Sequence, residues 1–212
     1  MEYYEVLSQR RMHRAFLPDP VPEESIQRIA RSIRRAPSGG YSQGQSVVVV
    51  TDEAMRHRIA RRFDDEASGE ETDGTSMIST APVHLILCFC ERLYHDRYNQ
   101  PDKLAITGGE ETTWPVPYWF IDVGAALMLV LMTAIAEGLA ATFFGDPNQE
   151  AILRELLDLP ADVVPIGITL IGYPAEDPDA DRATRVFKER RRPEADVIHR
   201  ERWRPAPTSA PS

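Results

Sequence analysis

The sequence Arg10-Arg11-Met12-His13-Arg14-Ala15-Phe16 is followed, after one helical segment, by Pro37-Ser38-Gly39-Gly40-Tyr41-Ser42-Gln43. The first stretch concentrates arginines in a chain whose formal net charge is -9 at pH 7. The arginine side chain carries a planar set of donors and a permanent charge, which suits an anion such as phosphate. Basic clusters are also commonly solvated turns. Taken alone, the cluster leaves both interpretations open.

Apolar strands alternate with helical segments around these two stretches. The apolar runs lack the alternation of apolar and polar residues that marks a sheet with one solvent-exposed face. This predicts a sheet covered on both faces by helices. The expected strands are 46–51, 82–89, 139–144 and 164–173. The expected helices are 2–11, 22–36, 52–63, 120–137 and 148–157. Segment 64–79 is acidic and rich in Gly, Ser and Thr, which predicts a mobile loop or a frayed helix end. Segment 94–117 shows no clear period and is long enough to be a lid or binding loop.

The longest apolar run, 120–136, contains Asp122 and is shorter than the roughly 20 residues that span a bilayer. We therefore expect a fully buried helix, with Asp122 satisfied by hydrogen bonds rather than acting as an acid. The polar N-terminus does not resemble a signal peptide. No extended basic stripe is present, so neither nucleic acid nor a membrane is an expected partner.

The length of 212 residues fits a single domain, which we place at 1–203, with a disordered Pro/Ala/Ser-rich tail at 204–212. Cys88 and Cys90 are the only cysteines, and on a strand they would point to opposite faces. The sequence has neither a second cysteine pair nor histidines at metal-ligand spacing, so it does not predict a metal site. The low cysteine count is typical of a reducing cytoplasm, where we expect the protein.

The order of the motifs resembles the opening of the FMN-dependent nitroreductase family, in which a basic phosphate motif precedes a helix and a Pro-Ser turn. The resemblance implies that Arg10, Arg11 and Arg14 bind the FMN phosphate. Met12 stands where the family has a serine hydroxyl, which removes one donor. The resemblance also implies that the basic segment with Arg190 and Arg192 reaches the same phosphate.

The Pro37–Gln43 stretch matches the family loop that lies near the flavin ring and comes from the neighbouring subunit. Small residues suit a backbone that approaches a flat ring closely. A plain helix end before a strand is the alternative. Tyr41 replaces the usual asparagine, and Gly44 and Gln45 replace the usual Pro-Trp. On the resemblance, the cofactor-contacting residues of this loop are Pro37, Ser38, Gly39, Tyr41 and Gln43.

The segment 138–145 resembles the family's Gly-Leu-Gly strand, and Gly172-Tyr173-Pro174 closely matches the end of its last strand. The backbone amide near Phe144 and Gly145 would then face flavin N5, where a donor stabilises the charge of the reduced ring. A strand-turn-helix of an ordinary α/β unit is the alternative for this region.

The resemblance implies an α+β fold (an α/β sandwich) with a central mixed sheet flanked by helices, in a homodimer. It implies hydride transfer from NAD(P)H through FMN to an electrophilic small-molecule acceptor such as a nitroaromatic or quinone. No side chain is assigned as catalytic. Two alternatives are a flavin-binding or flavin-storing protein without catalysis, and a deazaflavin or dehalogenase-type enzyme. Three aromatic residues are candidates for the substrate wall, with a place in the core or at an interface as the alternative: Trp114, Tyr118 and Trp119.

Overall fold

The computed structural model describes residues 1–68, 76–176, 186 and 188–203. The chain divides into two compact units, Met1–Glu176 and Asp177–Ser212. The second unit contains the short 3-10 helix η3 (Glu194–Asp196). The single domain expected over 1–203 remains a prediction, and the tail expected at 204–212 lies outside the described residues.

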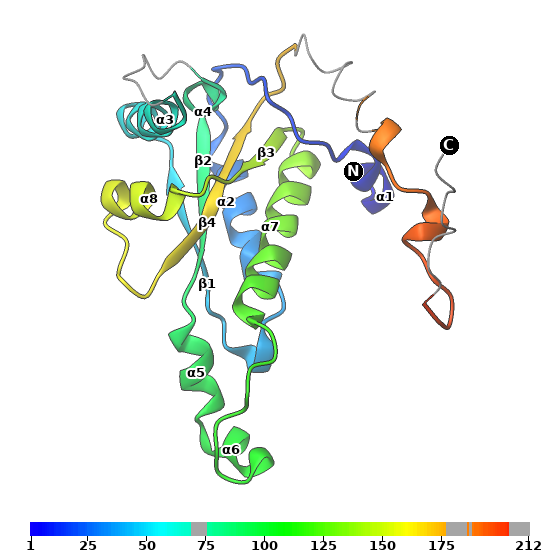
Figure 1. Cartoon of the computed structure of the whole chain (residues 1–212). Helices are drawn as coiled ribbons and strands as arrows, with labels where there is room; N and C mark the ends of the chain where they lie inside the picture. Colours follow the sequence, from blue (N-terminus) through cyan, green and yellow to red (C-terminus); the bar gives the residue numbers. More distant parts are fainter. Residues whose placement is uncertain (69–75, 177–185, 187, 204–212) are drawn as a thin grey trace. The chain divides into compact units, whose positions relative to one another are not determined.

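The first unit contains helices and strands that alternate along the chain much as the sequence predicts (Figure 1). Its helices are α1 (Tyr3–Gln9), α2 (Glu23–Arg31), η1 (Ser32–Arg35), η2 (Gly39–Tyr41), α3 (Glu53–Ser68), α4 (Met77–Thr80), α5 (Arg92–Tyr98), α6 (Pro101–Thr107), α7 (Tyr118–Ala136) and α8 (Gln149–Leu157). Its strands are β1 (Gln45–Val50), β2 (Val83–Phe89), β3 (Ala140–Phe144) and β4 (Val164–Gly172).

The four strands form one sheet in the order β1-β2-β4-β3. All three pairings in the described chain are antiparallel, so the α+β class is confirmed but the expected mixture of parallel and antiparallel strands is wrong for these residues. The mixed sheet was implied by the resemblance alone, because apolar strands buried on both faces look the same in a parallel and in an antiparallel sheet.

Helices cover both faces of the sheet, as predicted. Helices α2 and α7 lie on one face, and α3 and α8 lie on the other (Figure 1). Strand β2 shows why its sequence is apolar throughout. Leu85 and Leu87 join the core beneath α7, whereas Ile86 and Cys88 join the core beneath α3 and α8. Each face of β2 is therefore buried, and alternation disappears.

Residues 94–117 differ most from the sequence prediction, because much of this segment is helical. Helix α5 begins at Arg92 and α6 occupies Pro101–Thr107, where a loop was expected. Ion pairs of the i,i+4 kind, such as Arg92–Asp96, support α5 in place of an apolar stripe. The loop expected at 64–79 is also shortened, because α3 continues to Ser68 and α4 follows Ser76.

Helix α7 is long and apolar enough to cross a membrane by length and composition alone. It packs against the sheet and against α2, and it buries Asp122. The prediction that it is fully buried is wrong for the isolated chain, since Phe120 and Ile121 are 52% and 54% exposed. Together with Met128, which is also exposed, they form an apolar face of α7 that the described residues leave partly open, although the ring of Phe120 also contacts Phe89 of β2.

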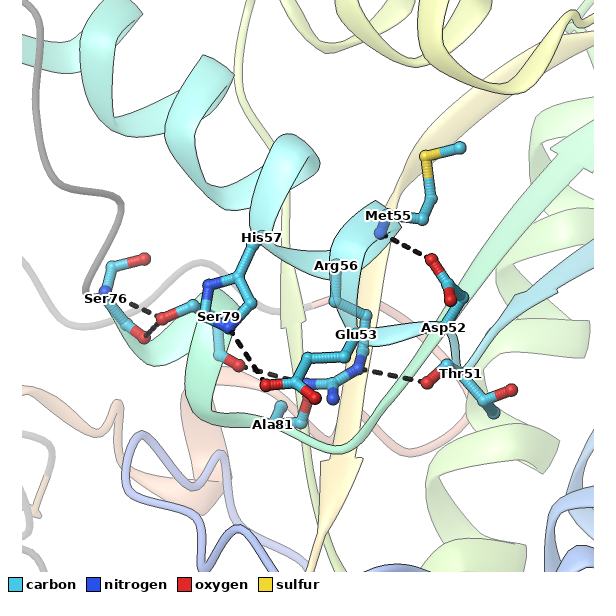
Figure 2. A network of polar contacts seen from close by, with 9 residues as sticks. All are labelled: Thr51, Asp52, Glu53, Met55, Arg56, His57, Ser76, Ser79 and Ala81. Atoms are coloured by element: carbon cyan, nitrogen blue, oxygen red, sulfur yellow. Dashed lines mark hydrogen bonds and ion pairs between the residues drawn. The ribbon is translucent and has the colours of Figure 1, made fainter.

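Arg56 of α3 fixes the short helix α4 to the start of β2. Figure 2 shows its guanidinium group between the backbone carbonyl of Thr51 and those of α4 and its C-cap. It donates to the oxygens of Ala81 at 2.9 Å and Ser79 at 3.1 Å. Ser76 caps α4 with its side chain and completes the network. Charge-assisted bonds to carbonyls that end a helix are strong, so this corner is well anchored.

Candidate functional site

The basic segment that opens the chain lies beside the end of the sheet. His13 donates its backbone N–H to Ala141 of β3 at 3.2 Å, and Leu17 donates to Tyr173 at 2.9 Å. A bridge between Phe16 and Pro174 extends this pairing. The arginines predicted to hold phosphate are therefore placed next to the start of β3.

A cavity of about 500 Å³ lies at this place. It is lined by Ser8, Gln9, Arg10, Arg11, His13, Ile135, Gly138, Leu139, Ala140 and Pro174. The Nε of Arg11 donates to the Nε2 of His13 at 2.9 Å. Arg10 and Arg14 form no ion pair with a carboxylate among the described residues, whereas Arg28 and Arg97 are each paired. Arg14 is exposed and does not line the cavity.

Strand β3 connects the basic segment to the second predicted cofactor contact. Phe144 lies three positions after Ala141, which at about 3.3 Å per residue amounts to about 10 Å. The ring of Phe144 packs edge-on against Phe63 on the α3 side of the sheet. Gly145 is exposed, so the backbone after Phe144 is open to a flat ligand.

The Pro37–Gln43 loop contains the 3-10 turn η2 and is held by two helices and by one bond of its own. Gly39 donates its backbone N–H to Asp122 of α7 at 2.8 Å, and Arg97 of α5 donates to the Gly40 oxygen at 2.9 Å. The hydroxyl of Ser38 accepts from the N–H of Gln43 at 3.0 Å. Tyr41 has a φ of 62° and is 75% exposed. The loop thus has a fixed backbone and presents an aromatic side chain outward.

Two glycines let this loop lie directly on α5. Gly40 has a φ of 60°, and a Cβ there would lie 2.6 Å from the ring of Tyr98. A Cβ at Gly44 would lie 2.4 Å from the ring of Tyr94. The glycine that departs from the family pattern at position 44 is therefore required by the tyrosine packed against it.

Asp122 is confirmed as a buried carboxylate satisfied by hydrogen bonds. It accepts from the N–H of Gly39 and from the hydroxyl of Tyr94, both at 2.8 Å. Burial, and then the contact with Asp122, raise the pKa of Tyr94 far above its usual range, so its hydroxyl remains a donor. This bond network ties the first turns of α7 to the loop and to α5.

The basic segment and the loop lie at opposite ends of α7. The loop is bonded to Asp122, whereas the cavity beside Arg10 is lined by Ile135 and Gly138. Ala136 lies fourteen positions after Asp122, which corresponds to about 20 Å along a helix at 1.5 Å per residue. One chain therefore does not bring the two predicted parts of the cofactor site together.

The three predicted substrate residues occupy different environments. Tyr118 is 39% exposed at the start of α7. Trp114 is partly buried at the centre of an aromatic cluster, and Trp119 is only 8% exposed in the core. Trp119 is therefore too buried to line a substrate pocket directly, and it can only support the residues that do. Its ring centroid lies 5.8 Å from that of Trp114.

Sequence reasoning missed the polar residues around this cluster. Glu111 accepts from the indole N–H of Trp114 at 3.0 Å and from Asn99 at 2.8 Å, and it contacts Nδ1 of His95. Glu91 lies 3.3 Å from the other ring nitrogen of His95. The spacing of Glu91 and His95 by four residues was the available signal, and it required α5 to be identified as a helix.

Arg190 and Arg192 belong to the second compact unit, and both are exposed. Arg192 donates to the backbone oxygen of Asp196 within that unit. Their convergence with Arg10 and Arg14 on one anion remains a prediction.

The sequence matches the Nitroreductase family over residues 7–173. This range contains every helix and strand of the first compact unit except the first four residues of α1. The chain therefore belongs to the nitroreductase family.

Individual relatives extend over nearly the whole chain. A putative NADH dehydrogenase/NAD(P)H nitroreductase of Archaeoglobus fulgidus is 26% identical over 95% of this chain and 99% of its own length. An FMN reductase [NAD(P)H] of Bacillus subtilis is 29% identical, over 95% and 74% respectively. Iodotyrosine deiodinase 1 of Rattus norvegicus is also 29% identical, over 86% and 67%.

A solved structure of B. megaterium NfrA1 superimposes with a TM-score of 0.71 and 25% identity. The match includes 96% of this chain and 76% of that one. The nitroreductase-like fold expected from the motifs is thus confirmed at the level of sequence and of structure.

Proposed function

We propose that this protein is an FMN-dependent oxidoreductase that accepts hydride from NAD(P)H and delivers it to an electrophilic small molecule, such as a nitroaromatic or a quinone. Family membership and the reductase names of two relatives support the reaction class. Bound FMN would supply the hydride-carrying chemistry. The chain's residues bind and orient the cofactor and the acceptor. We place the protein in the cytoplasm, in keeping with its two free cysteines.

The observation that carries this proposal is the chemistry of the donor set beside β3. Arg10 and Arg14 have no carboxylate partner among the described residues, although the chain is strongly acidic. Guanidinium groups that are not neutralised internally are suited to a phosphate dianion. The cavity beside Arg10 and Arg11 provides room for such a group. The donors present therefore fit the phosphate of FMN.

The backbone after β3 fits the other end of the same ligand. The interval of about 10 Å between Ala141 and Phe144 is comparable to the length of a ribityl phosphate arm. A phosphate held near Arg10 would leave the flavin ring close to Phe144 and Gly145. We propose that a backbone N–H there donates to the ring. Such a contact tolerates the phenylalanine side chain, which points away toward Phe63.

A second copy of the chain would complete the site. The loop with Ser38 and Gly39 lies too far along α7 to contact a flavin bound beside Arg10 of the same chain. The exposed face of α7, with Phe120, Ile121 and Met128, is an apolar surface of the kind that associating subunits bury. We propose a homodimer in which this loop of one subunit reaches the flavin of the other.

The acceptor would lie near α5 and the segment before α7, because these elements adjoin the loop that would cover the ring. Tyr118 is exposed there, and Trp114 supports it from the cluster behind, with ring centroids 6.0 Å apart. A dehalogenase is the second candidate function, favoured by the likeness to iodotyrosine deiodinase 1. The acceptor, a halogenated phenol or a nitroaromatic, would distinguish the two.

The test of the proposed cofactor compares FMN with riboflavin, which lacks phosphate. Arg10→Ala, which removes a donor that lines the cavity, is expected to weaken FMN by about ten- to a hundredfold, since one charge-assisted hydrogen bond contributes about 1.5–3 kcal/mol. Riboflavin binding should stay unchanged, and Arg192→Ala should behave in the same way. Arg34→Ala, on the exposed surface of η1, is the matched control. Equal losses for FMN and riboflavin would place the phosphate elsewhere.

A further inference from the structure

Trp114 is the centre of the aromatic cluster between α5 and α7. Its indole ring lies within 4.6 to 6.3 Å, centroid to centroid, of five other rings. These belong to Tyr94, His95, Tyr98, Tyr118 and Trp119. The position of Trp114 therefore determines how the exposed ring of Tyr118 is supported.

The carboxylate of Glu111 holds the indole of Trp114 through the indole N–H. Glu111 Oε1 accepts from Trp114 at 3.0 Å and also contacts Nδ1 of His95. The other oxygen of Glu111 accepts from Asn99 at 2.8 Å. Both His95 and Asn99 are anchored by α5, so Glu111 connects the segment before α7 to that helix. Asn99 follows the last residue of α5 and serves as its C-cap.

We propose that His95 is a positioning residue that acts through Glu111 to hold the indole of Trp114 against α5, and so maintains the wall on which the acceptor binds. The last part rests on the proposed function, which puts the acceptor beside this cluster. Nothing in the proposed hydride transfer requires His95 itself, since both of its ring nitrogens are occupied by glutamates.

The charged groups around His95 give this contact a pH dependence. Glu91, the N-cap residue of α5, and Glu111 face its two nitrogens, while Trp119 of α7 contacts its ring. The other charged groups nearby are engaged elsewhere: Asp122 of α7 with Tyr94, Arg92 with Asp96 and Asp162, Arg97 with Asp102 of α6, and Lys103 over Tyr98. The imidazolium of His95 therefore meets two carboxylates and no nearby unpaired cation among the described residues.

The contact with Glu111, and then that with Glu91, raises the pKa of His95 above its ordinary value of 6.5, despite some loss of solvent. Hydrogen bonds from Trp114, His95 and Asn99, in that order, lower the pKa of Glu111 to about 2.

Because the pKa of His95 is raised in the folded protein, the stabilisation from its contact with Glu111 is complete below pH 6.5 and is lost as the pH rises through the folded-state pKa. Because the pKa of Glu111 is lowered, the same stabilisation is also lost at the acidic end, as the pH falls toward 2. The contact is thus complete in mildly acidic solution and weakens in alkaline solution.

Hydrogen exchange of the FMN-loaded protein measures this directly, as the protection factor of the Trp114 indole N–H, which donates to Glu111, corrected for its intrinsic rate. We expect protection to fall by up to about fivefold between pH 6 and pH 9, the range of a solvent-accessible ion pair. His95→Gln keeps a donor but does not titrate, so its protection should be equal at the two pH values. The matched control is His57→Gln on α3, which removes another histidine paired with a glutamate four residues away.

Glu111→Gln gives a second test if the first variant does not fold. It retains an acceptor for Trp114 but removes the charge, so the pH-dependent fall should shrink. A fall in His95→Gln as large as in the wild type would overturn the proposal, and so would protection that does not change with pH in the wild type.

The substrate placement is tested separately with menadione as acceptor. The KM of the wild type should rise with pH in parallel with the loss of protection, with kcat unchanged, and this rise should be absent in His95→Gln. If protection follows His95 while KM does not, the positioning of Trp114 is upheld and the acceptor site of the proposed function is misplaced. If neither follows His95, the positioning itself is wrong.

Discussion

His84 provides a prediction whose size follows from the structure. Its side chain is fully buried on β2, and its Nε2 lies 2.6 Å from the backbone oxygen of Ile78. The other ring nitrogen, Nδ1, has no hydrogen-bond partner among the described residues. Protonation at Nδ1 would therefore create a buried charge and an unsatisfied donor together. Burial is the main reason that the pKa of His84 is lowered from 6.5 to about 4, and the nearby charges of Arg56 and His57 lower it further.

This lowered pKa makes the folded protein sensitive to acid. Above pH 6.5 the imidazole is neutral in both the folded and the unfolded chain, and its stabilisation is complete. Between 6.5 and 4 the unfolded chain binds the proton and the folded chain does not, so the free energy of unfolding decreases as the pH falls. At 1.36 kcal/mol for each pKa unit, the loss at pH 4 amounts to about 3 kcal/mol.

Urea unfolding at pH 7 and pH 4.5 tests this value with His84→Gln, whose amide N–H can still reach Ile78. Other carboxylates and histidines titrate equally in both proteins, so their contributions cancel in the comparison. The wild type should lose about 2–3 kcal/mol more than the variant between the two pH values. His57→Gln, on the exposed face of α3, should behave like the wild type. Equal losses in wild type and His84→Gln would refute a neutral buried imidazole.

Two further predictions concern the anchored corner and the subunit contact. Arg56→Ala should lower the free energy of unfolding by about 2–4 kcal/mol, because the carbonyl oxygens at the end of α4 lose charged donors; Arg58→Ala on the same helix should change it by less than about 0.5 kcal/mol in urea titrations. Met128→Glu should convert the proposed dimer to monomers in light scattering and release FMN, since it puts a charge in the exposed apolar face of α7; a variant that remains dimeric and keeps FMN would contradict the assignment of that face.

The apolar strands and the amphipathic helices could be predicted from sequence because local patterns specify them. The run at β2 indicated burial on both faces, which its contacts with the two cores confirm. Its pairing direction could not be predicted, since antiparallel and parallel strands buried on both sides look alike. Helix α7 shows the same limit, because an apolar pattern does not distinguish a face covered by the chain's own core from one left exposed.

Helices α5 and α6 were missed because their stability comes from charges and tertiary contacts. Helix α5 has ion pairs and tyrosines instead of an apolar stripe. Pro101 at the start of α6 and Gly108 at its end were the usable signals, and both were interpreted as loop residues. The contact of Glu111 with His95 could not be found in the sequence without these helices.

The arginines beside β3 and the backbone near Gly145 were predicted from motif order. In the structure, the basic segment pairs with the start of β3, and Gly145 follows the end of the same strand. The anchoring of the Ser38–Gly39 loop by Asp122 was not predicted, although Asp122 had been identified as a buried group needing partners. Contacts between distant segments require the fold, whereas motif spacing identifies only the segments themselves.

The central claim, that this chain is an FMN-dependent oxidoreductase, is tested most directly by one absorbance experiment on the purified protein. We predict a yellow protein that holds FMN in a one-to-one ratio to the chain and whose flavin absorbance bleaches on addition of NADH or NADPH without oxygen. Re-addition of a quinone or nitroaromatic acceptor should restore the colour. A colourless protein that binds no FMN in a titration would contradict the account, and a bound flavin that neither nicotinamide reduces would contradict the proposed reaction.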